Sequence, residues 1–197
     1  YLTRTPSGAG NQKTWTFSTW LKRGVLNPQS QILSVGNTGA GAPWFLMYLA
    51  DDDNLNVYWY NGSDVNANQT FTPILRDTSA WYNIVLRMDT TQNTDSNRVK
   101  LYINGVEASH GNSQYPTKDY DTLINGTSAH HIGRHGGGSY FDGYLAETIM
   151  LDGTSTDASS FGETKNGVWI PIDTSGLTFG TNGFRLEYKE TSVGSGS

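Results

Sequence analysis

The chain has 197 residues and a formal net charge of −5, from 13 Lys and Arg against 18 Asp and Glu. It contains no run of five or more basic residues, which argues against a nucleic-acid partner, and no apolar run near the roughly 18 residues of a membrane span. Cysteine is absent, which favours a reducing cytosol or a bacterial or viral source. The length suits one domain with a sizeable core.

Predicted strands recur along the chain at the spacing of an all-β sandwich, with turn residues between them. They lie at 15–22, 31–35, 44–49, 54–60, 71–75, 81–88, 99–106, 130–134, 140–151 and 183–188. In the first strand, Trp15, Phe17 and Leu21 share one face. Trp20 lies on the other face, which predicts a strand near the middle of a sheet, covered on both sides.

The pair of strands at 81–89 and 99–106 predicts an antiparallel sheet. A polar loop over 90–98 separates them, and Asn104-Gly105 then supplies the two positive φ angles of a type I′ turn. No segment keeps a period of 3.6 residues, so we expect very little helix, at most one turn after a capping Asp157. The small polar segment 191–197 predicts a linker, which leaves a single domain over 1–190.

Three segments resemble the laminin G-like branch of the concanavalin A-like lectin and glucanase superfamily. They are 16–22, 80–86 followed by 100–105, and 141–151. The resemblance implies an antiparallel jelly-roll β-sandwich whose first strand ends at 1–4 and begins ahead of Tyr1. It does not specify an activity, because one fold carries many functions.

Two finer features, 119–122 and 161–163 before 167–171, resemble laminin G-like modules in structural proteins of tailed, particularly marine, bacteriophages. This resemblance implies a module of a capsid-associated or tail-fibre protein, exposed on the surface of a virion. Its partners would be other virion subunits, and we expect a homo-oligomer.

Carboxylate spacing argues against an enzyme. The glucanases of the superfamily use Glu-x-Asp-x-x-Glu or a close variant, because retaining hydrolysis needs two carboxylates about 5 to 5.5 Å apart. Glu107, Glu147 and Glu163 each stand without a suitably spaced acidic partner. The pair His130-His131 does not predict a zinc site, because adjacent strand residues point to opposite faces and no cysteine is available.

The resemblance also implies a calcium site at the rim of the sandwich, built from Asp or Asn side chains and backbone carbonyls. The candidate ligands are Asp51 and Asp53 of the acidic turn 51–54, and Asp142. The alternative is structural: an acidic hairpin tip that keeps the turn soluble, and an Asx-type bond from Asp142 within its own loop.

An exposed aromatic surface would bind carbohydrate, since the C–H faces of sugars stack on rings. The candidates are Trp44, Tyr48, Tyr58, Trp59, Tyr60 and Tyr140. Because Tyr58 and Trp59 point to opposite faces of one strand, part of this set must belong to the core. Two functions therefore remain: virion architecture through protein–protein contacts, or a lectin-like adhesin that binds host-surface glycans with or without calcium.

Overall fold

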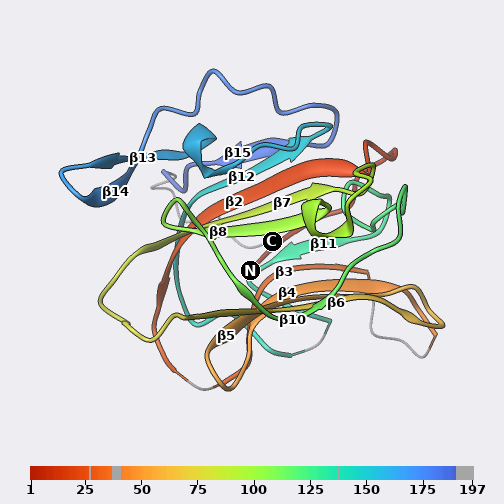
Figure 1. Ribbon diagram of the computed structural model, residues 1–197, viewed down its shortest axis with the longest axis horizontal. Helices are drawn as coiled ribbons and strands as arrows, with labels where there is room; N and C mark the ends of the chain where they lie inside the picture. The colour runs from red at the N-terminus through yellow and green to blue at the C-terminus, as the bar shows by residue number, and fades with distance from the viewer. Residues whose placement is uncertain (27, 37–40, 137, 190–197) are drawn as a thin grey trace, which may run out of the picture.

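Two antiparallel sheets face each other (Figure 1) in the computed structural model, which describes residues 1–26, 28–36, 41–136 and 138–189. The seven-stranded sheet has the order β1 (Leu2–Arg4), β11 (His130–Ile132), β3 (Ser30–Gly36), β4 (Trp44–Leu49), β5 (Asn54–Tyr60), β6 (Val65–Ile74) and β10 (His110–Gln114). The six-stranded sheet has the order β15 (Phe184–Leu186), β12 (Gly143–Asp152), β2 (Thr14–Arg23), β7 (Tyr82–Asp89), β8 (Val99–Ile103) and β9 (Val106–Glu107). The predicted antiparallel β-sandwich is confirmed.

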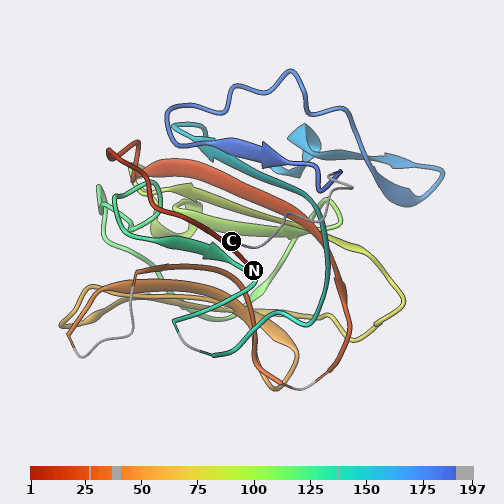
Figure 2. The same cartoon turned by 180° about the vertical axis from the view of Figure 1, so that it is seen from behind.

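Strand β1 lies at one edge of the seven-stranded sheet, where Leu2 pairs with Ile132 of β11. Figure 2, which shows the molecule from behind, has β1 in dark red beside β11 in teal. The predicted linker at 191–197 lies outside the described residues.

The prediction for β2 is confirmed. Trp15, Phe17 and Leu21 are fully buried between the sheets, and β2 lies between β12 and β7. Trp20 points to the opposite face of the strand, where it is half-buried beside Phe161.

The predicted turn chemistry is also observed. Asn104 and Gly105 have φ angles of 48° and 81°, and they join β8 to β9. The helices of the described chain are single 3₁₀ turns, Asp95–Asn97 and Ala158–Ser160, so neither is long or apolar enough to cross a membrane. The second turn is capped as predicted, because a carboxylate oxygen of Asp157 accepts the backbone N–H of Ser159 at 3.0 Å.

The core between the sheets is aromatic. The ring of Trp15 meets Phe45 edge-on at 6.0 Å between centroids, and Phe45 lies 5.6 Å from Trp59. Trp59 is 1 % exposed. This corrects its prediction as a carbohydrate platform: β5 directs Trp59 inward and Tyr58 outward, so the apolar indole fills the core.

A second apolar cluster lies on the other side of the six-stranded sheet, where the segment after β12 covers it (Figure 1). Phe161 packs there on Val85 and Ile149. A hairpin of β13 (Gly162–Lys165) and β14 (Val168–Pro171) holds Trp169 over the end of β8.

The indole of Trp169 is fixed on three sides. Its Nε1 donates to the side-chain oxygen of Asn83 at 3.1 Å. A Cβ at Gly105 would lie 2.4 Å from the ring, and one at Gly162 would lie 2.5 Å from it. The two glycines therefore make room for the indole.

A buried carboxylate connects three chain segments near the end of β12. Asp152, at the end of β12, accepts the backbone N–H groups of Asn11 at 2.7 Å and Asn182 at 2.8 Å. It also accepts the side-chain amide of Asn125 at 3.2 Å. One side chain thus joins three segments that are far apart in the sequence, and its lone pairs are satisfied as a buried acid requires.

Candidate functional site

The outward face of the seven-stranded sheet carries an aromatic cluster where β4 begins. The Trp44 ring stacks on Tyr58, with 4.9 Å between centroids and 24° between planes. Tyr60 and His135 lie 6.0 Å and 6.1 Å from the same ring. We call Trp44, Tyr58, Tyr60 and His135 the aromatic cluster. All four side chains are half-buried, so each is braced by a neighbour and still reaches solvent.

Tyr48 extends this aromatic surface along β4 toward the acidic turn. Burial raises the pKa of the Tyr48 hydroxyl above its ordinary value, and nearby Tyr58, Asp52 and Asp51 raise it further. The hydroxyl therefore stays protonated at neutral pH and is available as a hydrogen-bond donor.

An open cleft of about 450 Å³ adjoins the aromatic cluster. That volume is within the range of about 300–1,000 Å³ that is usual for small-molecule sites. Its lining comes from the end of β3, the residues before β4, and β11 with its flanking residues: Gly36, Ala42, Pro43, Ser128, Ala129, His131, Arg134 and Gly136. The Ser34 hydroxyl donates to the Arg134 carbonyl at 2.8 Å, which fastens the loop after β11 to the sheet.

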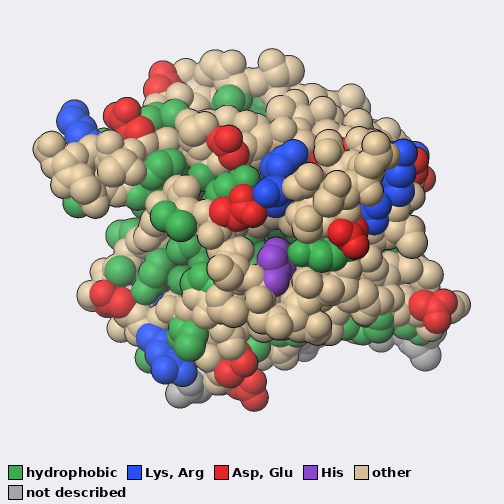
Figure 3. Space-filling view, viewed as in Figure 1, with side chains coloured by type: hydrophobic (Ala, Val, Ile, Leu, Met, Phe, Trp, Pro, Cys, Tyr) green, Lys and Arg blue, Asp and Glu red, His purple; other side chains and the backbone are tan. Residues whose placement is uncertain are grey.

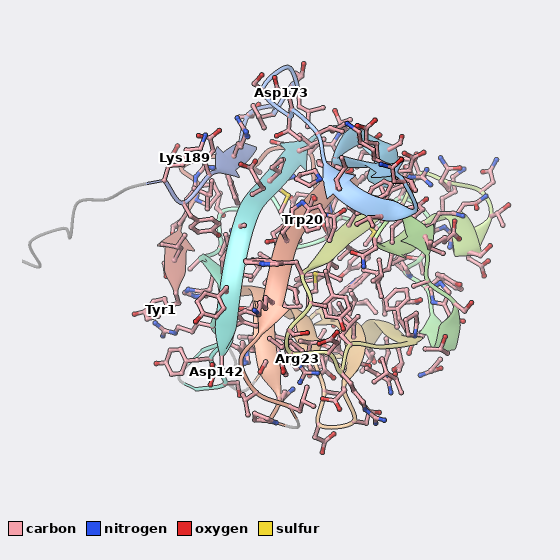
Figure 4. The ribbon with its side chains drawn as sticks, turned by 90° about the vertical axis from the view of Figure 1, so that its left-hand side faces the viewer. Tyr1, Trp20, Arg23, Asp142, Asp173 and Lys189 are labelled. Atoms are coloured by element: carbon pink, nitrogen blue, oxygen red, sulfur yellow. The ribbon has the colours of Figure 1, made fainter. Side chains whose placement is uncertain are left out.

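The guanidinium of Arg134 lies over an aromatic ring. Its central carbon is 4.5 Å from the centroid of Tyr1, and the Tyr1 ring is 6.0 Å from that of Tyr140. A cation over the face of a ring is attracted by the ring's quadrupole, so Tyr1 helps to fix the position of this guanidinium. Figure 4 shows Tyr1 at the edge of the sandwich. Tyr140 thus lies on the Arg134 side of the cleft and apart from the aromatic cluster.

The two adjacent histidines of β11 have different surroundings. His130 accepts the backbone N–H of Asn125 at Nε2, at 3.0 Å, and its Nδ1 lies 2.8 Å from the Ser128 carbonyl. Its proton is therefore on Nδ1. His131 lies on the outward face, where Nδ1 is 2.9 Å from the Thr3 hydroxyl. Their divergence agrees with the expectation that the pair does not share a metal.

Burial disfavours the charged forms of His131 in the cleft and of His135 in the aromatic cluster. It lowers the pKa of His131, and the positive charge of Arg134 lowers that pKa further. It also lowers the pKa of His135, to which His131 adds a smaller effect. At neutral pH the fixed positive charge of the cleft is therefore that of Arg134.

The predicted calcium ligands are not brought together, and Asp53 is not a calcium ligand. Its carboxylate lies 2.7 Å from Nη1 of Arg23 and 3.1 Å from Nε of Arg76, so cationic side chains already neutralise it. Asp53 is 1 % exposed, which also corrects its interpretation as part of a solvated hairpin tip. The correction has a physical reason: a buried carboxylate needs a fixed positive partner, and Arg23 supplies it.

Asp51 and Asp142 are exposed. Asp142 lies beside Gly24, next to Arg23 in Figure 4. Across the described ranges, no three His, Asp or Glu side chains are grouped closely enough to hold an ion. Calcium binding by Asp51 or Asp142 stays a prediction.

Two of the three glutamates considered as catalytic acids form ion pairs. Glu147 lies 3.1 Å from Nε of Arg185, and Glu107 lies 2.9 Å from Nζ of Lys100. Glu163 is exposed on the β13–β14 hairpin. The three belong to different strands, and two of them have a cation as their neighbour.

The structure thus unites Trp44, Tyr58 and Tyr60, places Tyr48 next to them and separates Tyr140. Sequence reasoning missed His131 and Arg134 as residues of the cleft, and His135 as a member of the aromatic cluster. The sequence feature that could have indicated them is the segment 130–135, which contains three histidines and an arginine.

A family model described as the concanavalin A-like lectin/glucanases superfamily, laminin G type, matches residues 2–159. The chain belongs to this superfamily. The predicted resemblance to laminin G-like modules is thereby confirmed. No curated protein sequence matches the chain.

Solved structures with this fold include animal and bacterial proteins. A pentraxin from Limulus polyphemus aligns with a TM-score of 0.51 and 16 % identity, over 78 % of this chain and 70 % of that one. Domain 4 of an arabinanase from Geobacillus stearothermophilus aligns at 0.51 and 19 %, over 74 % and 64 %. Domains LG4-5 of the mouse laminin α1 chain align at 0.54 and 11 %, over 94 % and 44 %. For the last two, the match spans less than two thirds of the other chain, and these likenesses establish the fold alone.

Proposed function

We propose that this protein is a non-catalytic glycan-binding module whose site is the aromatic cluster and the adjoining cleft. The observation that carries the proposal is the stack of Trp44 on Tyr58, half-buried on the outward face of a sheet, directly beside an open cleft. A partly exposed ring held by its neighbours suits the C–H surface of a sugar, and its fixed position reduces the entropy lost on binding.

The polar groups of the site fit the same purpose. Tyrosine hydroxyls, imidazoles and the Ser128 hydroxyl can exchange hydrogen bonds with the hydroxyls of a sugar. Small-molecule sites usually combine a largely apolar surface with a small number of convergent polar groups. One structure of the same fold, at a TM-score of 0.51, was solved in complex with arabinotriose, which supports a search among glycans.

The test is a glycan-array screen of the purified protein with and without calcium, alongside the variants Trp44→Ala and Trp81→Ala. Trp81 is 42 % exposed and lies outside the aromatic cluster, so it controls for removal of a surface indole. We expect Trp44→Ala to abolish binding and Trp81→Ala to retain it. Loss of glycan binding on addition of a chelator would support the prediction that Asp51 and Asp142 bind calcium. Equal binding by all three proteins would contradict the proposed site.

A second candidate function is particle architecture in a phage virion, through contacts with other subunits. Figure 3 shows hydrophobic side chains gathered on one face of the molecule. Val106 and Val168 are 70 % and 61 % exposed, on the hairpins that end at β9 and β14. Exposed apolar surface favours protein contacts. Analytical ultracentrifugation across concentration tests this candidate, which a strictly monomeric protein would disfavour.

A further inference from the structure

Arg134 differs from the other arginines of the chain in its partners. Each of the others donates a hydrogen bond to an oxygen: Arg4, Arg23, Arg76, Arg87, Arg98 and Arg185. The guanidinium of Arg134 forms no hydrogen bond or ion pair with any residue in the described ranges, and its buried Nε is without a partner. A buried N–H donor without a partner has lost its hydrogen bond to water without a replacement, which is costly.

The position of Arg134 is nevertheless fixed. The Tyr1 ring lies 4.5 Å from its central carbon, and its own carbonyl is bonded to Ser34. None of the described residues that line the cleft is acidic. Arg134 lines a cleft whose described lining has no carboxylate, and a guanidinium can supply a paired set of donors to an anion.

The aromatic cluster adjoins the cleft at two points of the chain. Pro43 and Gly136 line the cleft, and each is the direct neighbour of a member of the aromatic cluster, Trp44 and His135. A sugar ring on Trp44 would therefore lie beside the cleft that Arg134 lines. Hydrogen-bonding groups of His131 and Ser128 line the same space.

We propose that the cleft selects acidic glycans, with a carboxylate or sulfate bound by Arg134 and a sugar ring on the aromatic cluster. This inference rests on the proposed function and names the class of ligand that the site prefers. The shared chemistry is an oxyanion carried by a sugar, whether a uronic acid or a sulfate ester supplies it.

Calorimetric titration with matched ligands tests the proposal. Oligogalacturonate is compared with its methyl ester, which keeps the backbone and removes the charge, and dextran sulfate is compared with dextran. We expect each acidic ligand to bind at least about tenfold more tightly than its neutral partner, the scale of one charge-assisted hydrogen bond. A preference within only one pair would still support the proposal and would identify the source of the oxyanion.

Two variants assign the preference to Arg134. Arg134→Gln should lower the affinity for the acidic ligand about tenfold and change the affinity for the neutral one less than twofold. Lys165→Gln removes an equal charge from the exposed β13–β14 hairpin and should change neither affinity. A melting temperature within a few degrees of that of the parent protein shows that each variant is folded. If a variant does not fold, the comparison of acidic and neutral ligands on the parent protein still tests the selection of acidic glycans.

Three results would overturn the inference. Equal binding of the acidic and neutral members of both pairs, with no effect of Arg134→Gln, would refute acidic selection while leaving the glycan site intact. An equal loss of affinity for the acidic ligand in Lys165→Gln would show that binding depends only on the net charge of the protein. Binding of poly-glutamate as tight as that of the acidic glycan would show a general anion site. Absence of binding to any glycan would instead refute the proposed function itself.

Discussion

Nη1 of Arg23, in the six-stranded sheet, lies 2.7 Å from Oδ1 of Asp53, in a turn between two strands of the seven-stranded sheet. Both are almost completely buried, and the same Nη1 donates to the Leu75 carbonyl at 2.7 Å. The pair therefore connects β2 to the turn between β4 and β5 at one end of the core. A buried charge of this kind makes the end of the sandwich sensitive to the loss of either partner.

Arg23→Met should destabilise the protein by about 3–5 kcal/mol, because Asp53 would keep its charge in the core with less compensation. Arg76→Gln is the control, since it removes the other arginine bonded to Asp53, whose side chain is 62 % exposed. It should cost no more than about 1 kcal/mol. Urea unfolding followed by tryptophan fluorescence measures both. Similar losses in the two variants would contradict this account.

The glycines around Trp169 should be intolerant of a methyl group. Gly162→Ala would place a Cβ about 2.5 Å from the indole and should cost about 1–3 kcal/mol through overpacking. Gly176→Ala is the matched control, because a Cβ there meets nothing within 4 Å. In a Trp169→Ala background the cost of Gly162→Ala should largely disappear. Thermal unfolding of this double-mutant cycle measures the coupling, and strict additivity would refute the contact.

Folding stability should decrease as pH falls below about 6.5, the ordinary pKa of an unfolded histidine. Burial lowers the pKa of His130, Arg4 and His131 lower it further, and the hydrogen bond to Ser128 opposes the shift. The folded state therefore binds fewer protons than the unfolded state, so stability is fully present above that pH and is lost as protons bind. Unfolding in urea at pH 7.5 and 5.5 measures the slope. His130→Gln should reduce it, and an unchanged slope would exclude His130 as a source.

Binding of an acidic glycan should strengthen as pH falls from 8 to 5.5. His131 faces the Thr3 hydroxyl from β1, neighbouring His130 and Arg134 of the next loop, while His135 faces His131 and Trp44. A bound anion would raise the pKa of His131 in the cleft and of His135 nearby, so protons would be taken up with the ligand. We expect about threefold tighter binding of oligogalacturonate at pH 5.5. Its methyl ester should show no comparable change in the same titrations.

Alternation and turn residues were sufficient to predict the sandwich. Trp15, Phe17 and Leu21 marked an inward face, and Asn104 with Gly105 marked a hairpin. The polar strand β10 gave no such signal, because its residues are mostly exposed and it pairs with β6 at the edge of the sheet. Edge strands can form through backbone bonds alone, which a pattern of side chains does not record.

The site was harder to predict than the fold. Alternation separates Tyr58 from Trp59 but does not say which of them points inward, since both are large aromatic residues. Asp53 belongs to an acidic turn, and only the folded chain brings Arg23, 30 positions away, against it. The contact of His135 with Trp44 likewise joins segments about ninety residues apart and depends on how β11 pairs with β3.

The covering of the six-stranded sheet has a consequence for the limits of the module. The family match ends at residue 159, yet Phe161, Trp169 and Phe179 cover the outer apolar cluster beyond that point. Asn182 also supplies a donor to Asp152. A chain that ended at residue 159 would lack part of the outer apolar cluster, and Asp152 would lose the hydrogen bond from Asn182. The packed core is therefore larger than the unit of sequence similarity, and it includes Phe184 and Leu186 of β15.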